Sequence, residues 1–213
     1  WFLQDQIEDT DASGVSPLPR ADRRQLFDAA DWRRAQGDLT AELAQLSMRF
    51  GMLNERLSRM GQGACQRLAI REASEFSWWA GERVSIERLS LWLGARIGGG
   101  LDESLALSQA GWAVRRLTAG LAPCDPNWLE GAGHLLGYER FTPGIEELAE
   151  VMASSRDLHP VTQSAILFHA WRMIGQGAAT DAESHVLAAC HGASMLGPAS
   201  KRAATYLPLI AAG

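Results

Sequence analysis

Apolar residues recur with a regular spacing over one long segment of the chain. Between Leu39 and Met60 the intervals alternate between four and three residues. This period of about 3.5 residues predicts one long helix with a narrow apolar stripe, beginning after Asp38 as its N-cap and ending at Gly61. Such a stripe is typical of a helix in a bundle and also of a seam between two chains. It is therefore a candidate interaction stripe, made of Leu39, Leu43, Leu46, Phe50, Leu53, Leu57 and Met60.

Helical spacing and capping residues predict helices along the rest of the chain as well. No run alternates apolar and polar residues as a half-buried strand would, so the expected fold class is all-α, a multi-helix bundle. Residues 1–19 are acidic and contain two prolines, which predicts a flexible arm before a helical domain over 20–213, with a sub-boundary near 122–128. The further helices are expected at about 22–36, 64–79, from Ser85, 103–119 with Asp102 as cap, 128–136, from Thr142, 159–174 and from Thr180 to the Gly-Pro pair at 197–198. The first of them should turn Leu26, Phe27, Ala30 and Trp32 toward the core.

Two short stretches predict how helices begin and end. In SEFSWWAGERVSIERL, residues 74–89, two tryptophans precede Gly81 and a new helical pattern. Gly81 can end one helix and Ser85 can cap the next, so the stretch is interpreted as a joint between two packed helices. Thr180 to Glu183 has the Ser/Thr-x-x-Glu pattern of a capping box, in which the glutamate side chain reaches back to the start of its helix.

Composition narrows the classes of partner and compartment. The net charge is -5, whereas a protein that grips the phosphate backbone carries a clustered basic surface. The local basic cluster is interleaved with aspartates, which is typical of a solvated helix face; it comprises Arg20, Arg23, Arg24, Arg33 and Arg34. No apolar run approaches the ~20 residues of a membrane span, and three widely spaced cysteines without a Cys-x-x-Cys pair indicate free thiols in a reducing compartment. We expect a cytoplasmic protein without membrane contact.

The sequence holds no motif that specifies a reaction. His185 and His191 are six residues apart, which does not place them on one helical face as metal ligands, and no hydrolase, metalloprotease or phosphate-loop pattern occurs. No residue is therefore assigned to catalysis, to a cofactor or to a metal. Most tryptophans fall at helical core spacings. An alternative remains a pocket for a nucleotide or planar ligand, or an enzyme of unrecognised chemistry, built from Trp79, His159, His169 and Trp171.

Two segments resemble the helical region of Fic-domain proteins. In the first, residues 67–93, the matching positions are Ser74, Ser77, Gly81, Ser85 and Leu89. The family's inhibitory glutamate before the glycine is replaced by Ala80. In the second, LHPVTQSAILFHAWRMIGQG, the matching positions are His159, Pro160, Ala165, His169, Trp171 and Ile174.

The resemblance implies a degenerate Fic-like bundle without nucleotide transfer. The family's catalytic loop should begin at Gly175, but GQGAATDAE lacks its histidine, its Asn-Gly and its arginine. From residue 20 onward the chain also resembles an uncharacterised, often plasmid-borne bacterial family in which such a domain precedes a helix-turn-helix. That similarity implies a non-enzymatic regulatory or interaction domain of a DNA-binding transcriptional regulator, with a homodimer or protein partner, and with DNA bound only outside this chain. A structural subunit of a larger assembly is the third alternative.

Overall fold

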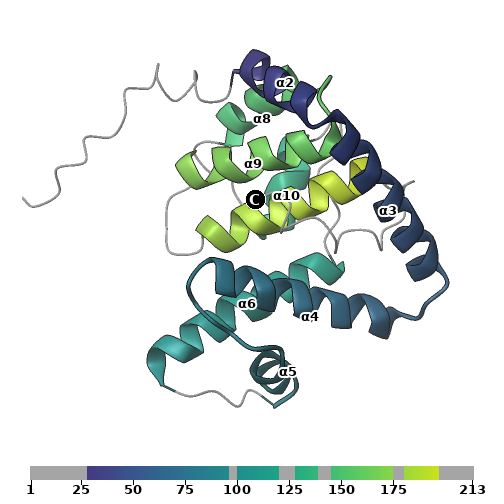
Figure 1. The fold of residues 1–213 in the computed structure, drawn as a ribbon. Coiled ribbons are helices and arrows are strands. Elements are labelled where there is room, and N and C mark those ends of the chain that lie inside the picture. The colour runs from purple at the N-terminus through teal and green to yellow at the C-terminus, as the bar shows by residue number, and fades with distance from the viewer. Residues whose placement is uncertain (1–27, 96–99, 120–127, 139–144, 175–179, 197–213) are drawn as a thin grey trace, which may run out of the picture.

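The computed structural model describes residues 28–95, 100–119, 128–138, 145–174 and 180–196, and within these ranges all regular structure is helical. The predicted all-α class is thereby confirmed. The helices form a bundle (Figure 1). They are α2 (Ala29–Asp38), α3 (Thr40–Ser58), α4 (Gln62–Trp79), α5 (Ile86–Ala95), α6 (Leu101–Ala119), α7 (Trp128–Leu136), α8 (Ile145–Ser154), α9 (Pro160–Ile174) and α10 (Thr180–Leu196).

The centre of the bundle is the antiparallel pair α9 and α10. Every residue from Ala182 to Ala193 in α10 is buried, and the α9 side chains Phe168 and Trp171 are at most 1% exposed. Helix α10 is enclosed on all sides, and it combines small and apolar residues with the buried polar side chains Glu183, His185 and His191. The two helices run side by side with α4 and α6 against them (Figure 1). One large core cluster joins α4 through α10.

The joint between α4 and α5 forms as predicted. Gly81 has φ +89°, a left-handed conformation that glycine adopts without a Cβ clash. The buried hydroxyls of Ser74 and Ser77 bind the following turn: Ser74 donates to the Val84 carbonyl over 2.7 Å, and the Val84 N–H donates to Ser77 over 3.0 Å. Ser85 caps α5 by accepting from the Arg88 N–H over 3.3 Å. Because these hydroxyls satisfy buried backbone groups, the joint is tightly specified.

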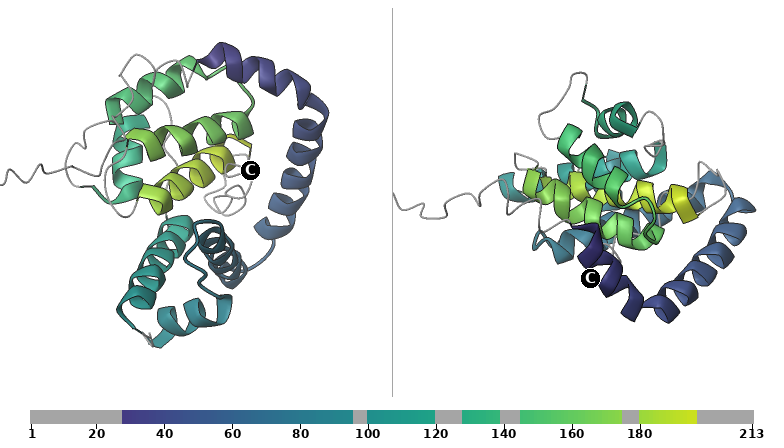
Figure 2. Two further views of the ribbon diagram at one scale, coloured as in Figure 1. Left: turned by 60° about the vertical axis from the view of Figure 1, so that its left-hand side comes forward. Right: turned by 90° about the horizontal axis from the view of Figure 1, so that it is seen from above.

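Helices α2 and α3, together called the α2–α3 arm (residues 29–58), lie on the outside of the bundle. They form a bent arm that passes around the α9–α10 pair and leads into α4 (Figures 1 and 2). In α2 no residue is buried, Ala30 is exposed, and Trp32 is half-buried against the main core. The inward orientation predicted for Ala30 is therefore wrong, and Leu26 and Phe27 lie outside the described residues.

Two predicted caps are also wrong. Asp38 is the last residue of α2, and Leu39 alone separates α2 from α3, at the cap position and without a side-chain hydrogen bond. Asp102 lies inside the first turn of α6, because that helix already begins at Leu101. There its carboxylate is still favourably placed near the positive end of the helix dipole.

The bounds predicted for the first helix, 22–36, are also wrong, because Asp28 is the extended N-cap of α2 and the helix runs from Ala29 to Asp38. The other boundaries agree with the sequence to within three residues where the structure describes them. Helices α4, α7, α9 and α10 begin and end within two residues of their predicted bounds. The predicted arm at 1–19, the sub-boundary near 122–128, and Thr142 with Pro143 lie outside the described residues. In the described ranges, no helix has both the length and the apolar character needed to cross a membrane.

Candidate functional site

One row of the interaction stripe on α3 faces the chain's own core. Leu43 and Phe50 form a small cluster with Val161 of α9 and Ala193 of α10, and Leu46 and Leu196 pack at its edge. Leu57, seven residues after Phe50, is 3% exposed. These residues recur every seven positions, so they lie in one line along the helix. The bundle role predicted for α3 is thus fulfilled by half of its stripe.

The other row of the stripe is largely open to solvent. Leu39, Leu53 and Met60 are 50%, 37% and 47% exposed. Met48 and Met52 on the same helix are exposed as well, so this one helix and its two ends hold five of the twelve large exposed apolar side chains in the described residues. Such a concentration on one element marks an interaction surface more often than scattered apolar residues do.

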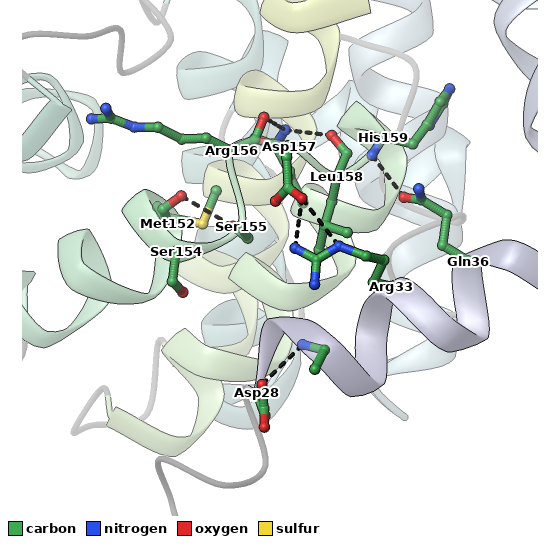
Figure 3. A network of polar contacts seen from close by, with 12 residues as sticks. Asp28, Arg33, Gln36, Met152, Ser154, Ser155, Arg156, Asp157, Leu158 and His159 are labelled. Carbon is green, nitrogen blue, oxygen red and sulfur yellow. Dashed lines mark hydrogen bonds and ion pairs between the residues drawn. The ribbon is translucent and has the colours of Figure 1, made fainter.

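A polar network fastens α2 to the connection between α8 and α9 (Figure 3). The Arg33 guanidinium donates to the Asp157 carboxylate over 3.1 and 2.5 Å. The pKa of Asp157 is lowered chiefly because its carboxylate accepts these hydrogen bonds. One helical turn further on, the Gln36 side-chain carbonyl accepts from the His159 backbone N–H over 2.7 Å. The contact therefore reaches the residue just before α9.

The imidazole of His159 links α3 to the start of α9. Its Nδ1 lies 3.2 Å from the Val161 N–H, which donates to it, and its Nε2 lies 2.9 Å from the Ser47 hydroxyl. Ser47 itself donates to the Leu43 carbonyl over 2.9 Å, so its oxygen is free to accept from an Nε2–H. This pattern assigns the neutral Nε2–H tautomer and makes His159 the N-cap of α9. Burial lowers the pKa of His159.

The other three predicted pocket residues lie apart from His159. Trp79 at the end of α4 packs against Phe76 and Phe168, with the Arg172 guanidinium 5.2 Å from its ring centre. His169 lies against Trp32 and Phe168. The fully buried Trp171 donates its indole N–H to Glu183 over 2.9 Å. Trp79 is nevertheless 42% exposed, so the structure leaves part of its side chain open to solvent.

Two buried groups missed at the sequence level meet between α4 and α10. Glu72 Oε1 lies 3.4 Å from His185 Nε2, and both side chains are at most 5% exposed. Desolvation raises the pKa of Glu72 well above its usual value and lowers the pKa of His185 to about 3. The pair is thus an uncharged acid and an uncharged imidazole, and His185 stacks on Phe76 with ring centres 4.2 Å apart.

A second buried carboxylate joins three parts of the bundle. Glu183 accepts from the Tyr138 hydroxyl, just after α7, and from the Trp171 indole of α9. Its place in the first turn of α10 is favourable for a negative charge. Desolvation and this carboxylate raise the pKa of Tyr138. The capping-box pattern correctly located the start of the helix, and the Glu183 carboxylate fastens the end of α7 and α9.

One open pocket in the described part of the chain is smaller than a typical ligand site. An open pocket of about 70 Å³ lies between α4, α6 and the start of α10, whereas sites for drug-sized ligands span roughly 300–1,000 Å³. The four predicted pocket residues are not among those that line it in the described ranges: Ala73, Phe76, Ser77, Ala80, Glu82, Ala106, Gln109, Ala110, Ala113, Asp181 and Ala182. Among the described residues, no three His, Cys, Asp or Glu side chains gather as metal ligands would.

The cysteines Cys65 and Cys190 are free and buried. Burial, with the nearby Glu72, raises the pKa of the Cys190 thiol. A thiol in this setting is a packing residue and not a nucleophile, because the reactive form is the thiolate.

A sequence signal for Glu72 existed. It shares a helical face with Ala69, Ala73 and Phe76, all of which are buried, so an acidic side chain in that row predicts a buried carboxyl. Its partner His185 is 113 residues away, and only the tertiary fold identifies it.

Comparison of the chain with protein families, with curated proteins and with solved structures gives no match. The Fic-like resemblance and the similarity to helix-turn-helix regulators therefore stay predictions that rest on the residues quoted above. Of the segment that would hold the Fic catalytic loop, 175–183, residues 175–179 lie outside the described residues and 180–183 form the first turn of α10.

Proposed function

We propose that this chain is a non-enzymatic helical interaction domain that self-associates through the exposed row of α3. The observation that carries the proposal is the row Leu39, Leu53 and Met60 beside a buried row of the same stripe. Positions 39, 46, 53 and 60 repeat every seven residues, which is the repeat of a seam between parallel or antiparallel helices. A second copy of α3 is the partner with a matching repeat.

The charged residues on one side of the exposed row of α3 favour an antiparallel pair. Glu42 and Arg56 are exposed, lie at equal distances before and after Arg49, and follow the same seven-residue repeat. In a two-fold symmetric antiparallel pair, Glu42 of each copy would therefore come close to Arg56 of the other. A parallel pair would not bring these charges together, because the same flank of the two copies then lies on opposite sides of the seam.

The experiment is a measurement of molar mass by light scattering for the native chain and two variants. The native chain should show twice 23.2 kDa at high concentration, and Leu53→Arg should give the monomer because a charge is then buried in the seam. Gln45→Arg, which adds the same charge at an exposed position of the same helix, is the matched control and should stay dimeric. At about 0.5 mM even a weak dimer is populated. A native chain that remains monomeric at this concentration would refute the proposal.

The wider role that we propose is the dimerisation or signal-sensing part of a cytoplasmic bacterial DNA-binding regulator. Its support is the resemblance to helix-turn-helix regulators, together with the acidic net charge of -5, which leaves DNA contact to a part outside these residues. In a mobility-shift assay at about 0.15 M salt, residues 1–213 alone should not retard duplex DNA. Sequence-specific retardation by these residues alone would contradict that role.

A further inference from the structure

We propose that protonation of His159 releases the α2–α3 arm from the bundle and exposes Leu43 and Phe50, which completes the apolar seam of α3. The inference concerns the regulation of the interface, and so it rests on the proposed self-association. The structural basis is that a single imidazole holds both the start of α9 and the middle of α3.

Protonation would break the cap geometry of His159. In the neutral ring, Nδ1 accepts from the Val161 N–H over 3.2 Å. In the imidazolium, both nitrogens are donors, so Nδ1–H would face another N–H. The positive charge would also lie at the N-terminus of α9, a 15-residue helix whose dipole disfavours a cation there. The ring must therefore leave this position, and its contact with Ser47 goes with it.

The remaining attachments of the arm are few. The Arg33–Asp157 ion pair has side chains that are 50% and 58% exposed, and such pairs contribute little to stability. Helix α2 has no buried residue, but its half-buried Trp32 packs against the main core and His169, and Gln36 accepts from the His159 backbone N–H. Beyond the His159 contacts, α3 is held to α9 and α10 by the small cluster around Leu43 and Phe50.

The charged groups around His159 are few. From α2 and the α8–α9 connection come Arg33 and Asp157, which pair with each other. Ser47 of α3 and Gln163 of α9 are neutral, and α10 contributes His191, whose Nε2 lies 3.1 Å from the Gln163 side-chain oxygen. Because His191 can also take up a proton, the test must isolate His159.

Release would change what α3 can bind. Along the heptad stripe, Leu43 and Phe50 belong to one row, and Leu46 and Leu53 belong to the other. With both rows free, an antiparallel partner helix could place its Leu53 opposite Leu43 and its Phe50 opposite Leu46, as in a two-stranded coiled coil. The contacts of His159 with Ser47 and Val161 are called the latch. While the latch holds the arm against the bundle, Leu43 and Phe50 stay buried and this complete seam cannot form.

Amide hydrogen exchange tests the latch in chains that carry Leu53→Arg, so that the proposed interface is disabled. Protection factors of residues 40–58, taken relative to those of α9 and α10, should fall by up to about tenfold per pH unit as the pH decreases below the ordinary imidazole value of 6.5, until the lowered folded pKa of His159 is reached. A released 19-residue helix is marginally stable alone, and so its amides lose protection. In the double variant with His159→Asn, asparagine supplies an uncharged N-cap acceptor, and protection should stay unchanged between pH 7.5 and pH 5.

The outcomes separate the latch from the interface. If residues 40–58 keep their protection at pH 5, or if the His159→Asn chain loses it as the parent does, the latch is refuted. If protection falls only when His159 is present, the latch holds. The molar mass of the chain with native Leu53 then tests the interface: release without tighter dimerisation would refute the completed seam, whereas a chain that stays monomeric at every pH would refute the proposed function and leave the release of the arm intact.

Discussion

Replacing Glu72 by glutamine keeps the shape of the buried Glu72–His185 contact but removes its titrating proton. In the native chain the pair is buried and uncharged, so it holds one proton over a wide pH range. In the unfolded chain the glutamate and the histidine titrate near 4.5 and 6.5. Between these two values the folded and unfolded pairs each hold one proton, and the pair contributes no pH dependence to the free energy of unfolding.

Outside this window the sign follows from counting protons. Above pH 6.5 the unfolded chain loses its histidine proton while the folded pair keeps one on Glu72, so the stability of the native chain falls by about 1.4 kcal/mol per pH unit until the raised pKa of Glu72 is reached. Below pH 4.5 the unfolded chain holds two protons and the folded pair one, so stability falls again toward the His185 pKa of about 3. The pair therefore favours a stability optimum between the two unfolded values.

In the Glu72→Gln chain the folded pair holds no proton until the pH approaches the pKa of His185. Its stability should be flat above pH 6.5 and should fall as the pH decreases below 6.5. Relative to the native chain, the variant should thus gain about 1.4 kcal/mol per pH unit from pH 5.5 upward, until the raised pKa of Glu72 in the native fold is reached. A glutamine amide can accept from the His185 Nε2–H as the protonated carboxyl does.

Urea unfolding followed by tryptophan fluorescence, at steps from pH 5 to pH 8.5, measures this difference. Glu87→Gln, at an exposed position of α5, is the control and should differ from the native chain by a constant amount. A difference between Glu72→Gln and the native chain that does not change with pH would refute the reasoning, because it would mean that Glu72 is charged in the fold as it is in the unfolded chain.

Three further substitutions test packing and backbone conformation by urea unfolding. Gly81→Ala should destabilise the chain by about 1–2 kcal/mol because φ of Gly81 is +89°. Gly51 lies in the exposed middle of α3 with no atom near its Cβ position, so Gly51→Ala should stabilise the chain by about 0.5–1 kcal/mol. A stability change of the same sign for both variants would contradict the account. Trp171→Phe should cost about 1–3 kcal/mol because Glu183 loses a buried donor, and a loss below about 0.5 kcal/mol would mean that the carboxylate finds another donor.

Helix existence was predictable because local signals in this chain are strong. The glycine and serine signals at Gly81 and Ser85, and the start of α10 at Thr180, depend only on neighbouring residues. The Asp38 cap failed for a tertiary reason: α2 continues through Asp38, and the chain bends at the single residue Leu39. An acidic residue before an apolar stripe does not distinguish a cap from the last turn of a preceding helix.

The candidate site was only partly predictable. A period of about 3.5 residues identifies the stripe on α3 but not which row meets the chain itself, and the structure assigns Leu43 and Phe50 to the inner row and Leu53 to the outer one. His159 was singled out as part of a pocket, but its contacts depend on Ser47 and Gln36, which are more than 110 residues away. Pairings over such separations leave no local pattern.

The most direct test of self-association through α3 is a charge exchange, read as the dissociation constant of the dimer in a dilution series by light scattering. Glu42→Arg and Arg56→Glu should each weaken the dimer by up to about tenfold, because two symmetric exposed ion pairs are lost. The double variant restores both pairs in reverse, and it should recover the native dissociation constant. A double variant as weak as the two single variants, or a chain that never dimerises, would contradict the account.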